Sequence, residues 1–162
     1  MTADNQQERL DSRWVSGFVD GEGCFHVSIN KSPKMSIGWQ VLPEFRIVQH
    51  ERDESVLEKL QKFFNAGQVV TNHDTRKELR IRKTQDLRKI VSFFEQHPLQ
   101  TKKKKDLEIF GKILELMENK KHLTIEGLTE IANLCWLMNR KVKPRFLESS
   151  ETTCQKSIMI KI

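Results

Sequence analysis

The sequence of 162 residues is poor in cysteine, and its three cysteines are scattered. Cys24, Cys135 and Cys154 lie far apart, and there is no CxxC motif or closely spaced pair of cysteine and histidine. This pattern argues against a zinc site and against a disulfide framework, and it favours a reducing, intracellular compartment. An apolar run of about 18 residues is also missing, so the sequence predicts no membrane span.

The first residues are polar and contain no apolar signal-peptide core, so we expect residues 1–12 to form a polar arm. Basic residues outnumber acidic ones, with 28 Lys and Arg against 22 Asp and Glu and a formal net charge of +6. Such an excess fits an anionic partner but does not prove one. The length is enough for one domain with its own core.

The stretch VSGFVDGEG at residues 15–23 carries most of the information in the chain. It places Asp20 and Glu22 at the C-terminal end of a short apolar helix, which we expect over residues 13–22. The helix macrodipole disfavours negative charge at that end by about 0.3–1 kcal/mol per group. A divalent cation would stabilise acids in this position. A solvated acid in a helix cap is the ordinary alternative, and composition alone favours it.

The two glycines of the same stretch suggest a partner for the helix. Gly17 and Gly21 are four residues apart, so they share one helix face. Small residues on one face allow another helix to approach closely. The residues therefore predict a pair of helices that brings carboxylates together around a metal ion.

Three blocks of the sequence together resemble one known family. VSGFVDGEG resembles the signature of the LAGLIDADG homing endonucleases, with an acid in its usual place. Residues 45–49 (FRIVQ), followed by Asp53 and Leu57, are similar to the next recurrent segment of that family. Residues 98–103 (PLQTKK) are similar to its segment near the end of the fold core. The resemblance covers residue 13 to about residue 139.

The hydrophobic periodicity predicts helices and strands in an order that fits this family. The expected elements are a helix at 13–22, strands at 24–30 and 38–49, a helix from a capping box at Ser55 to about 65, strands at 68–72 and 77–83, a helix from Thr84 to the break at Pro98, and helices at about 103–119 and 124–138. Pro43 indicates an edge or an irregularity in the second strand. The resemblance implies an α+β fold, an αββαββα core with an antiparallel β-saddle and additional C-terminal helices. We expect one domain over residues 13–140 and a tail of uncertain order at 141–162.

The resemblance also implies roles for particular residues. Glu22 is the expected catalytic metal ligand, with the carbonyl of Gly21 as an additional ligand and Mg²⁺ as the cofactor; Mn²⁺ or Ca²⁺ are expected to substitute for binding. Gln49 is expected to orient a water nucleophile, since an amide both donates and accepts. Lys102 opens a run of four lysines and is expected to stabilise developing charge. Without the resemblance, Gln49 would be an ordinary strand-end residue and the lysines a solvated run.

Two further sets of residues complete these expectations. Outward-facing strand residues and lysines and arginines in turns are expected to contact the bases and phosphates of double-stranded DNA. This DNA-binding set is His26, Ser28, Asn30, Lys31, Lys34, Gln40, Arg46, Asn72, Arg76, Lys77, Glu78, Arg80, Arg82 and Lys103. A plain solvated sheet face is the alternative. The chain has one signature copy, which in this family means a homodimer, and its expected interface residues are Val15, Gly17, Phe18, Asp20 and Gly21.

The function that the resemblance implies is that of a site-specific DNA endonuclease. Such an enzyme cuts both strands of a long, near-palindromic target and leaves 3′ overhangs. The family is typically encoded within introns, often in mitochondria or chloroplasts. The alternatives are an intron RNA maturase on the same fold, a catalytically silent DNA-binding protein, and a basic α/β domain with no nucleic-acid role.

Overall fold

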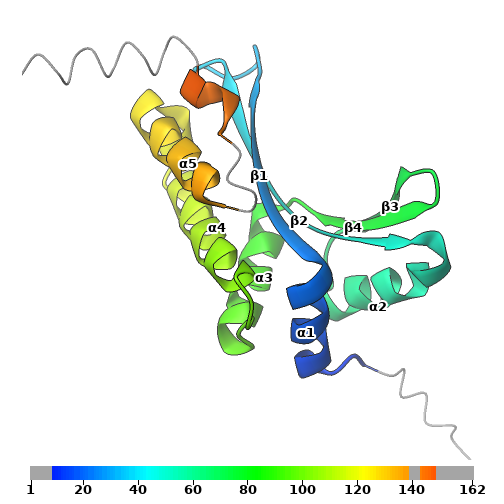
Figure 1. Ribbon diagram of the computed structural model, residues 1–162. Coiled ribbons are helices and arrows are strands. Elements are labelled where there is room, and N and C mark those ends of the chain that lie inside the picture. Colours follow the sequence, from blue (N-terminus) through cyan, green and yellow to red (C-terminus); the bar gives the residue numbers. More distant parts are fainter. Residues whose placement is uncertain (1–8, 139–142, 149–162) are drawn as a thin grey trace, which may run out of the picture. The chain divides into compact units, whose positions relative to one another are not determined.

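The computed structural model describes residues 9–138 and 143–148, and its elements follow the predicted order. The chain forms α1 (Ser12–Glu22), β1 (Gly23–Lys31), β2 (Trp39–His50), α2 (Glu54–Phe64), β3 (Gln68–His73), β4 (Arg76–Ile81), α3 (Thr84–Gln96), α4 (Lys103–Glu118) and α5 (Ile125–Leu137) (Figure 1). Short 3₁₀ turns are η1 (Glu51–Asp53), η2 (Lys121–Leu123) and η3 (Arg145–Glu148). The αββαββα core with additional C-terminal helices is therefore confirmed.

The strands form one four-stranded sheet in the order β1-β2-β4-β3. Strand β4 pairs antiparallel with β2, from Phe45 opposite Ile81 to His50 opposite Arg76, and antiparallel with β3 on its other side. The chain folds into two compact units: one takes Phe45–Thr101 and the chain up to Cys24, and the other takes Phe25–Glu44 and the chain from Lys102. Strand β2 thus contributes its first half to one unit and its second half to the other.

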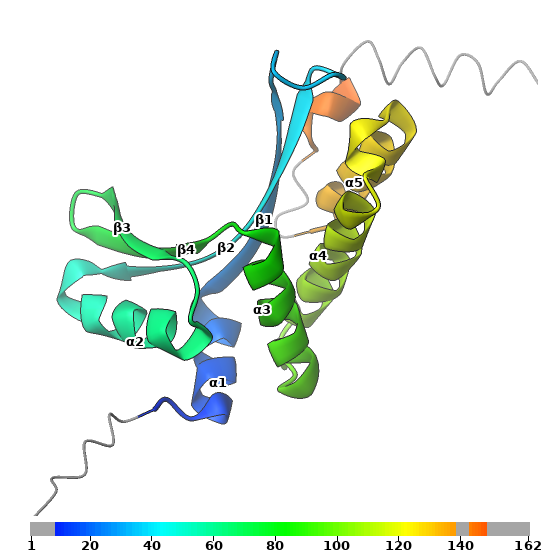
Figure 2. The ribbon, with the colours of Figure 1, turned by 180° about the vertical axis from the view of Figure 1, so that it is seen from behind.

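The first unit is built around phenylalanine. Helix α2 runs along the β3–β4 hairpin, which Figure 2 shows from behind. Phe63 and Phe64 of α2 contact Phe93 of α3 with ring centroids 5.3 and 5.5 Å apart, and Phe45 of β2 contacts Phe64 at 6.2 Å. Aromatic pairs in such edge-to-face arrangements add to the stability from buried area. This cluster fixes the second half of β2, on which Gln49 lies.

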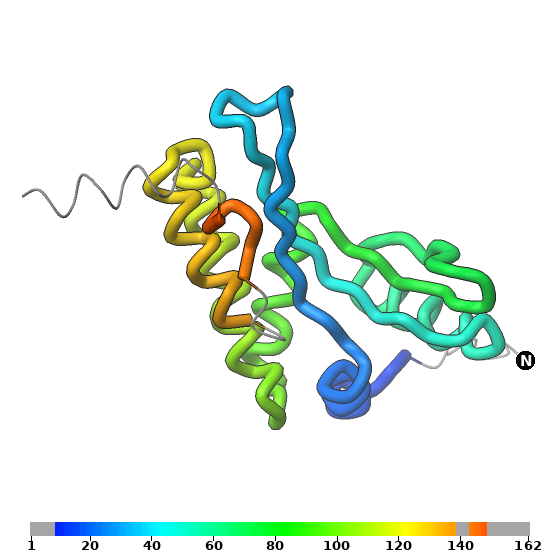
Figure 3. The backbone as a smooth tube through the Cα atoms, turned by 45° about the horizontal axis from the view of Figure 1, so that its top comes forward, coloured from blue at the N-terminus to red at the C-terminus, as the bar shows by residue number. Residues whose placement is uncertain are grey.

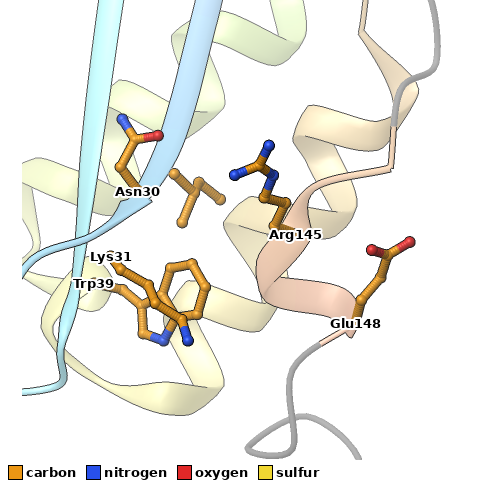
Figure 4. A pocket seen from close by; sticks show the side chains of 6 residues that line it. Asn30, Lys31, Trp39, Arg145 and Glu148 are labelled. Carbon is orange, nitrogen blue, oxygen red and sulfur yellow. The ribbon is translucent and has the colours of Figure 1, made fainter.

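In the second unit, α4 and α5 lie side by side. The β1–β2 hairpin runs next to these helices (Figure 3). Phe25 of β1 meets Phe110 of α4 with ring centroids 5.4 Å apart. Phe146 of η3 is fully buried and lies edge-on to Trp39, with centroids 5.3 Å apart. Phe146 is thus packed within this unit, while the expectation of a tail of uncertain order at 141–162 stays a prediction; residues 141–142 and 149–162 lie outside the described residues.

Three local expectations need comment. The carboxylate of Asp11 accepts hydrogen bonds from Arg13 N and Trp14 N and caps α1; the polar arm at residues 1–12 stays a prediction, and residues 1–8 lie outside the described part. The start of α2 at Ser55 is wrong, because the helix begins at Glu54, directly after η1. Pro43 lies in the half of β2 that has no partner on the β4 side, because the pairing of β2 with β4 begins at Phe45 opposite Ile81. The expected edge is therefore present locally, although β2 as a whole lies between β1 and β4.

The one-domain expectation for residues 13–140 stays a prediction. Within the described ranges, none of the helices has the length and the apolar character that a membrane crossing would need.

Gly67 offers a test of how tightly the first unit is packed. Its φ is +81°, and a Cβ there would lie 2.7 Å from the carbonyl oxygen of Arg80. We expect Gly67→Ala to lower the free energy of unfolding by about 2–5 kcal/mol, from backbone strain plus this clash. Gly38 is the matched control, because its φ is +74° but nothing lies within 4 Å of the added Cβ.

Gly38→Ala should therefore cost only the strain, about 1–2 kcal/mol. Chemical denaturation of both variants measures the difference. Equal losses for the two variants would show that the contact with Arg80 carries no cost.

Candidate functional site

The C-terminal end of α1 is held by its apolar side and by the turn that follows. Val15 and Val19 are fully buried. Gly23 takes an extended backbone conformation and starts β1 with no intervening loop. A Cβ on Gly23 would meet Val19 Cγ1 at 2.6 Å and Val19 O at 2.9 Å, so the turn requires glycine. This fixed turn leaves Glu22, the last residue of the helix, on the surface.

Glu22 and Gln49, which lie 27 positions apart in the sequence, meet in the structure. The Gln49 Nε2 atom donates a hydrogen bond to Glu22 Oε2 at 3.1 Å. Gln49 follows Phe45 and Ile47 on the same side of β2, where a polar residue replaces the buried ones at the end of the strand. The amide therefore orients the carboxylate, and both predicted catalytic residues of the first unit belong to one site.

The donor set at this site fits a hard cation. Carboxylate and carbonyl oxygens are the ligands that Mg²⁺ and Ca²⁺ prefer. Glu22 supplies an exposed carboxylate, and Gly21 is among the last residues of the helix, whose carbonyls lack intrahelical partners. Among the described residues, no group of three or more His, Cys, Asp or Glu side chains is placed to hold a metal ion. A cation held by Glu22 would therefore need further donors, and the role of Glu22 as a metal ligand stays a prediction.

Asp20 has a different role from Glu22. Its carboxylate accepts hydrogen bonds from Gln100 N at 2.6 Å, from Thr101 N at 3.2 Å and from Thr101 Oγ1 at 2.5 Å. These contacts fix the segment that directly precedes Lys102. The carboxylate of Asp20 thus binds a segment of its own chain, and the place of Asp20 at the dimer interface stays a prediction.

The lysines at 102–105 begin the second of the two chain segments that form the second unit. Lys102 is exposed at the N-cap of α4, and its side chain makes no capping bond; Lys103 is the first residue of the helix. Cations at a helix N-terminus oppose the macrodipole, so an anion nearby would stabilise them. Lys102 and Glu22 belong to different units, and the catalytic role of Lys102 stays a prediction.

The polar side of each unit carries much of the expected DNA-binding set. In the second unit, His26, Ser28 and Asn30 alternate with the buried side of β1. The exposed or half-buried members of the set in this unit also include Lys31, Lys34, Gln40 and Lys103. In the first unit they include Arg46, Asn72, Arg76, Arg80 and Arg82. Contact with DNA by these residues stays a prediction.

Two members of that set need correction. Lys77 lies in β4 and not in a turn; it shares the buried side with Leu79 and pairs its Nζ with Glu54 Oε1 at 3.3 Å. Glu78 lies on the polar side, but it is only 1% exposed and bonds to Arg80. Strand alternation predicts the side of the sheet correctly, but it does not give the depth to which neighbouring strands bury a residue.

One side of α1 remains open. A Cβ on Gly17 or Gly21 would meet nothing within 4 Å in this chain. Next to these glycines, Trp14 and Phe18 stack with ring centroids 4.9 Å apart, and Trp14 is 44% exposed. Val15 does not belong to this open side, which corrects its place in the expected interface, because its side chain is fully buried within the chain.

Two histidines of the described ranges and one cysteine there have structural explanations. His50 Nδ1 accepts a bond from Arg52 N, and His97 stacks on Phe93. Burial lowers the pKa of His122. Burial also raises the pKa of the Cys135 thiol to about 12, so this cysteine is protonated at neutral pH.

Comparison with known proteins decides the family. The model of the LAGLIDADG endonuclease family matches residues 15–114, which include most of α1, the sheet, α2, α3 and most of α4. This chain belongs to the LAGLIDADG endonuclease family. Probable intron-encoded endonuclease 2 of Neurospora crassa is 38% identical over 144 residues, which are 85% of this chain. The match spans only 32% of that relative's length.

Solved structures agree with this assignment. The homing endonuclease I-TnaI superposes with a TM-score of 0.81 at 51% identity, covering 91% of this chain and 97% of I-TnaI. The LAGLIDADG homing endonuclease I-SmaMI, solved bound to cleaved DNA, superposes with a TM-score of 0.82 at 34% identity. That match covers 86% of this chain but 47% of I-SmaMI. The LAGLIDADG fold predicted from the sequence is therefore confirmed.

The Asp20 contacts predict a structural role that can be measured. We expect Asp20→Ala to lower the free energy of unfolding by about 2–3 kcal/mol, because it removes a charged acceptor of several hydrogen bonds. Thr101→Val is the matched partner variant and should cost less, since it removes only the Oγ1 bond. Denaturation of both single variants and the double variant gives the coupling free energy.

Hydrogen exchange gives a second measurement of the same contacts. The amides of Gln100 and Thr101 should lose protection in Asp20→Ala. Strictly additive losses in the double-variant cycle, with unchanged exchange at these amides, would contradict a direct role for Asp20.

Proposed function

We propose that this chain is a site-specific, metal-dependent DNA endonuclease that acts as a homodimer and cuts both strands of a near-palindromic target. The observation that carries the proposal is the hydrogen bond between Gln49 and Glu22 at the end of α1, in a chain of the LAGLIDADG family. Structures of I-SmaMI bound to cleaved DNA, and to uncleaved target with calcium ions, support DNA and a divalent cation as the ligands.

The chemistry follows from the donor types at the site. A divalent cation held by Glu22 and the Gly21 carbonyl would activate water and shield charge on the phosphate. Gln49 holds the Glu22 carboxylate through one N–H, and its side-chain carbonyl oxygen is able to accept a hydrogen bond from a water molecule and so orient it. In our proposal Lys102 donates to the scissile phosphate and stabilises the charge that develops on its oxygens. Mg²⁺ is the expected cation, with Ca²⁺ supporting binding.

The homodimer rests on the single signature stretch in this sequence and on the open side of α1. The match covers 47% of I-SmaMI, and two copies of the matched part would cover a length similar to that of I-SmaMI. Each copy would contribute one Glu22 and cut one strand, leaving 3′ overhangs. The glycines of α1 would let the two helices approach closely, with Trp14 and Phe18 beside them. Within the described residues, each copy has only the one exposed carboxylate of Glu22 at this helix end.

The target is proposed to be long and read along the polar side of the sheet. Arg46, Arg80 and the amides of Asn30 and Gln40 are the side-chain types that recognise guanine and adenine in the major groove. Lysines and arginines in the loops suit phosphates, so binding should weaken steeply as salt rises. Relatives named as intron-encoded endonucleases support intron homing as the biological role, in a mitochondrion or chloroplast.

The carboxylate of Glu22 provides the main test. We expect Glu22→Gln to abolish double-strand cleavage and to retain binding, because the amide removes the negative ligand without changing its size. Purified protein is incubated with Mg²⁺ or with EDTA and with DNA from the version of the host gene that lacks the intron. Glu51→Gln is the matched control, an equal change at an exposed acid just beyond β2.

The control variant should cut like the wild type. A discrete cut by wild type that disappears with EDTA and in Glu22→Gln alone supports the proposal. Full activity in Glu22→Gln would contradict it, and so would binding to intron RNA with no cut in DNA.

Because one side of α1 is open, a larger side chain on that side should change the assembly of the protein but not the stability of its fold. Within one chain the Cβ of residue 17 is free of contacts, and leucine has a higher helix propensity than glycine by almost 1 kcal/mol. We expect Gly17→Leu to fold at least as stably as the wild type but to be monomeric and inactive. Sedimentation measures the mass, and thermal unfolding measures the stability.

Gly17→Ala is the milder companion and should weaken the dimer less. A Gly17→Leu variant that remains dimeric and active would exclude close packing of α1 against a second copy.

A further inference from the structure

A buried acid lies beneath an arginine on the polar side of the first unit. Leu79 and Ile81 of β4 are fully buried on the helix side, so Glu78 and Arg80 face the opposite, polar side. Arg80 Nε donates to Glu78 Oε1 at 2.6 Å. The side chain of Glu78 is 1% exposed and that of Arg80 is 32% exposed. The pair therefore consists of a hidden carboxylate and a guanidinium that reaches the surface.

The surroundings of Glu78 do not favour a carboxylate. Its partners across the neighbouring strands are Val48 of β2 and Val70 of β3. Among the described residues, the Oε2 atom of Glu78 is buried without a hydrogen-bond partner. A buried charge with an unsatisfied oxygen lowers stability, and an apolar residue between two valines would be more favourable. Stability therefore does not explain the acid at this position.

The neighbours of Arg80 point to recognition of bases. Across the sheet, Arg80 lies opposite Arg46 on β2 and opposite Gln68 on β3. The Arg80 guanidinium, held by Glu78, is a donor group that suits an acceptor-rich ligand. Gln68, Arg80 and Arg82 also line a recess of about 300 Å³ on this unit. This row of guanidinium and amide groups has the chemistry that reads base edges.

We propose that Glu78 is a positioning residue that fixes Arg80 to read one guanine in the major groove; the inference rests on the proposed function. Glu78 binds Nε, so recognition of guanine O6 and N7 falls to the two terminal nitrogens of the guanidinium. A fixed guanidinium plane makes such a paired contact more selective than a mobile one. Because Glu78 is buried below Arg80, its negative charge orients the arginine without facing the phosphates.

The test is a selection that needs no known target. Full-length protein is incubated, in EDTA to prevent cutting, with double-stranded DNA randomised over the whole site, and the bound duplexes are sequenced. Wild type, Glu78→Gln and Arg80→Lys are compared. Glu54→Gln is the matched control, because it makes the same change at an acid that pairs with Lys77 on the other side of β4.

We expect Arg80→Lys to lose the preference for guanine at one base pair of each half-site. Glu78→Gln should lower the preference at that same base pair about tenfold, within the range of one bidentate contact, and leave other positions unchanged. Glu54→Gln should leave every base preference as it is in the wild type.

A second variant separates positioning from folding. Glu78→Val matches its valine neighbours and should unfold at the same or a higher temperature than the wild type while losing the same guanine preference. If Glu78→Val unfolds at a lower temperature and loses preference at all positions, Glu78 has only a structural role and the inference is wrong. An unchanged preference in Glu78→Gln also overturns it, and leaves the proposed function standing. A wild type that enriches no sequence overturns both.

Discussion

The rest of the site depends on how the C-terminal end of α1 is held. Val15 and Val19 anchor one side of the helix in the first unit, and Gly23 turns the chain into β1 with no room for a side chain. That anchoring leaves the opposite side, with its two glycines, open. It also presents Glu22 at the surface beside Gln49. The proposed homodimer, in which two such ends meet, needs both the anchor and the open side.

Three acids of the first unit show how tertiary structure divides similar side chains among different roles. Glu22 stays exposed at a helix end that disfavours its charge. Asp20, two residues before it, turns inward and binds the backbone of Gln100 and Thr101. Glu78 is hidden below Arg80 on the polar side of the sheet. None of these three acids stabilises the helix or strand on which it lies. The position of each acid is explained instead by the group that it contacts or is proposed to contact.

The periodicity of apolar residues predicted the elements well, because burial on one side imposes its period on the sequence. The alternation of Phe25, Val27 and Ile29 gave β1 and its buried side. Local signals were less reliable. The capping box at Ser55 did not start α2, because the chain already turns at η1 before it. The packing of Phe146 on Trp39 could not be predicted either, since an isolated apolar residue has no period.

The sequence by itself determined the family, the order of the elements and the acid at the end of the first helix, because these are written in contiguous motifs and in local periodicity. Only the tertiary structure decided which distant residues meet. The contacts of Gln49 with Glu22 and of Asp20 with Thr101 span 27 and 81 positions, and no spacing rule reports them. The burial of Glu78 was likewise decided only by the tertiary structure. The two valines that lie opposite it belong to two other strands, so only the strand register brings them next to it.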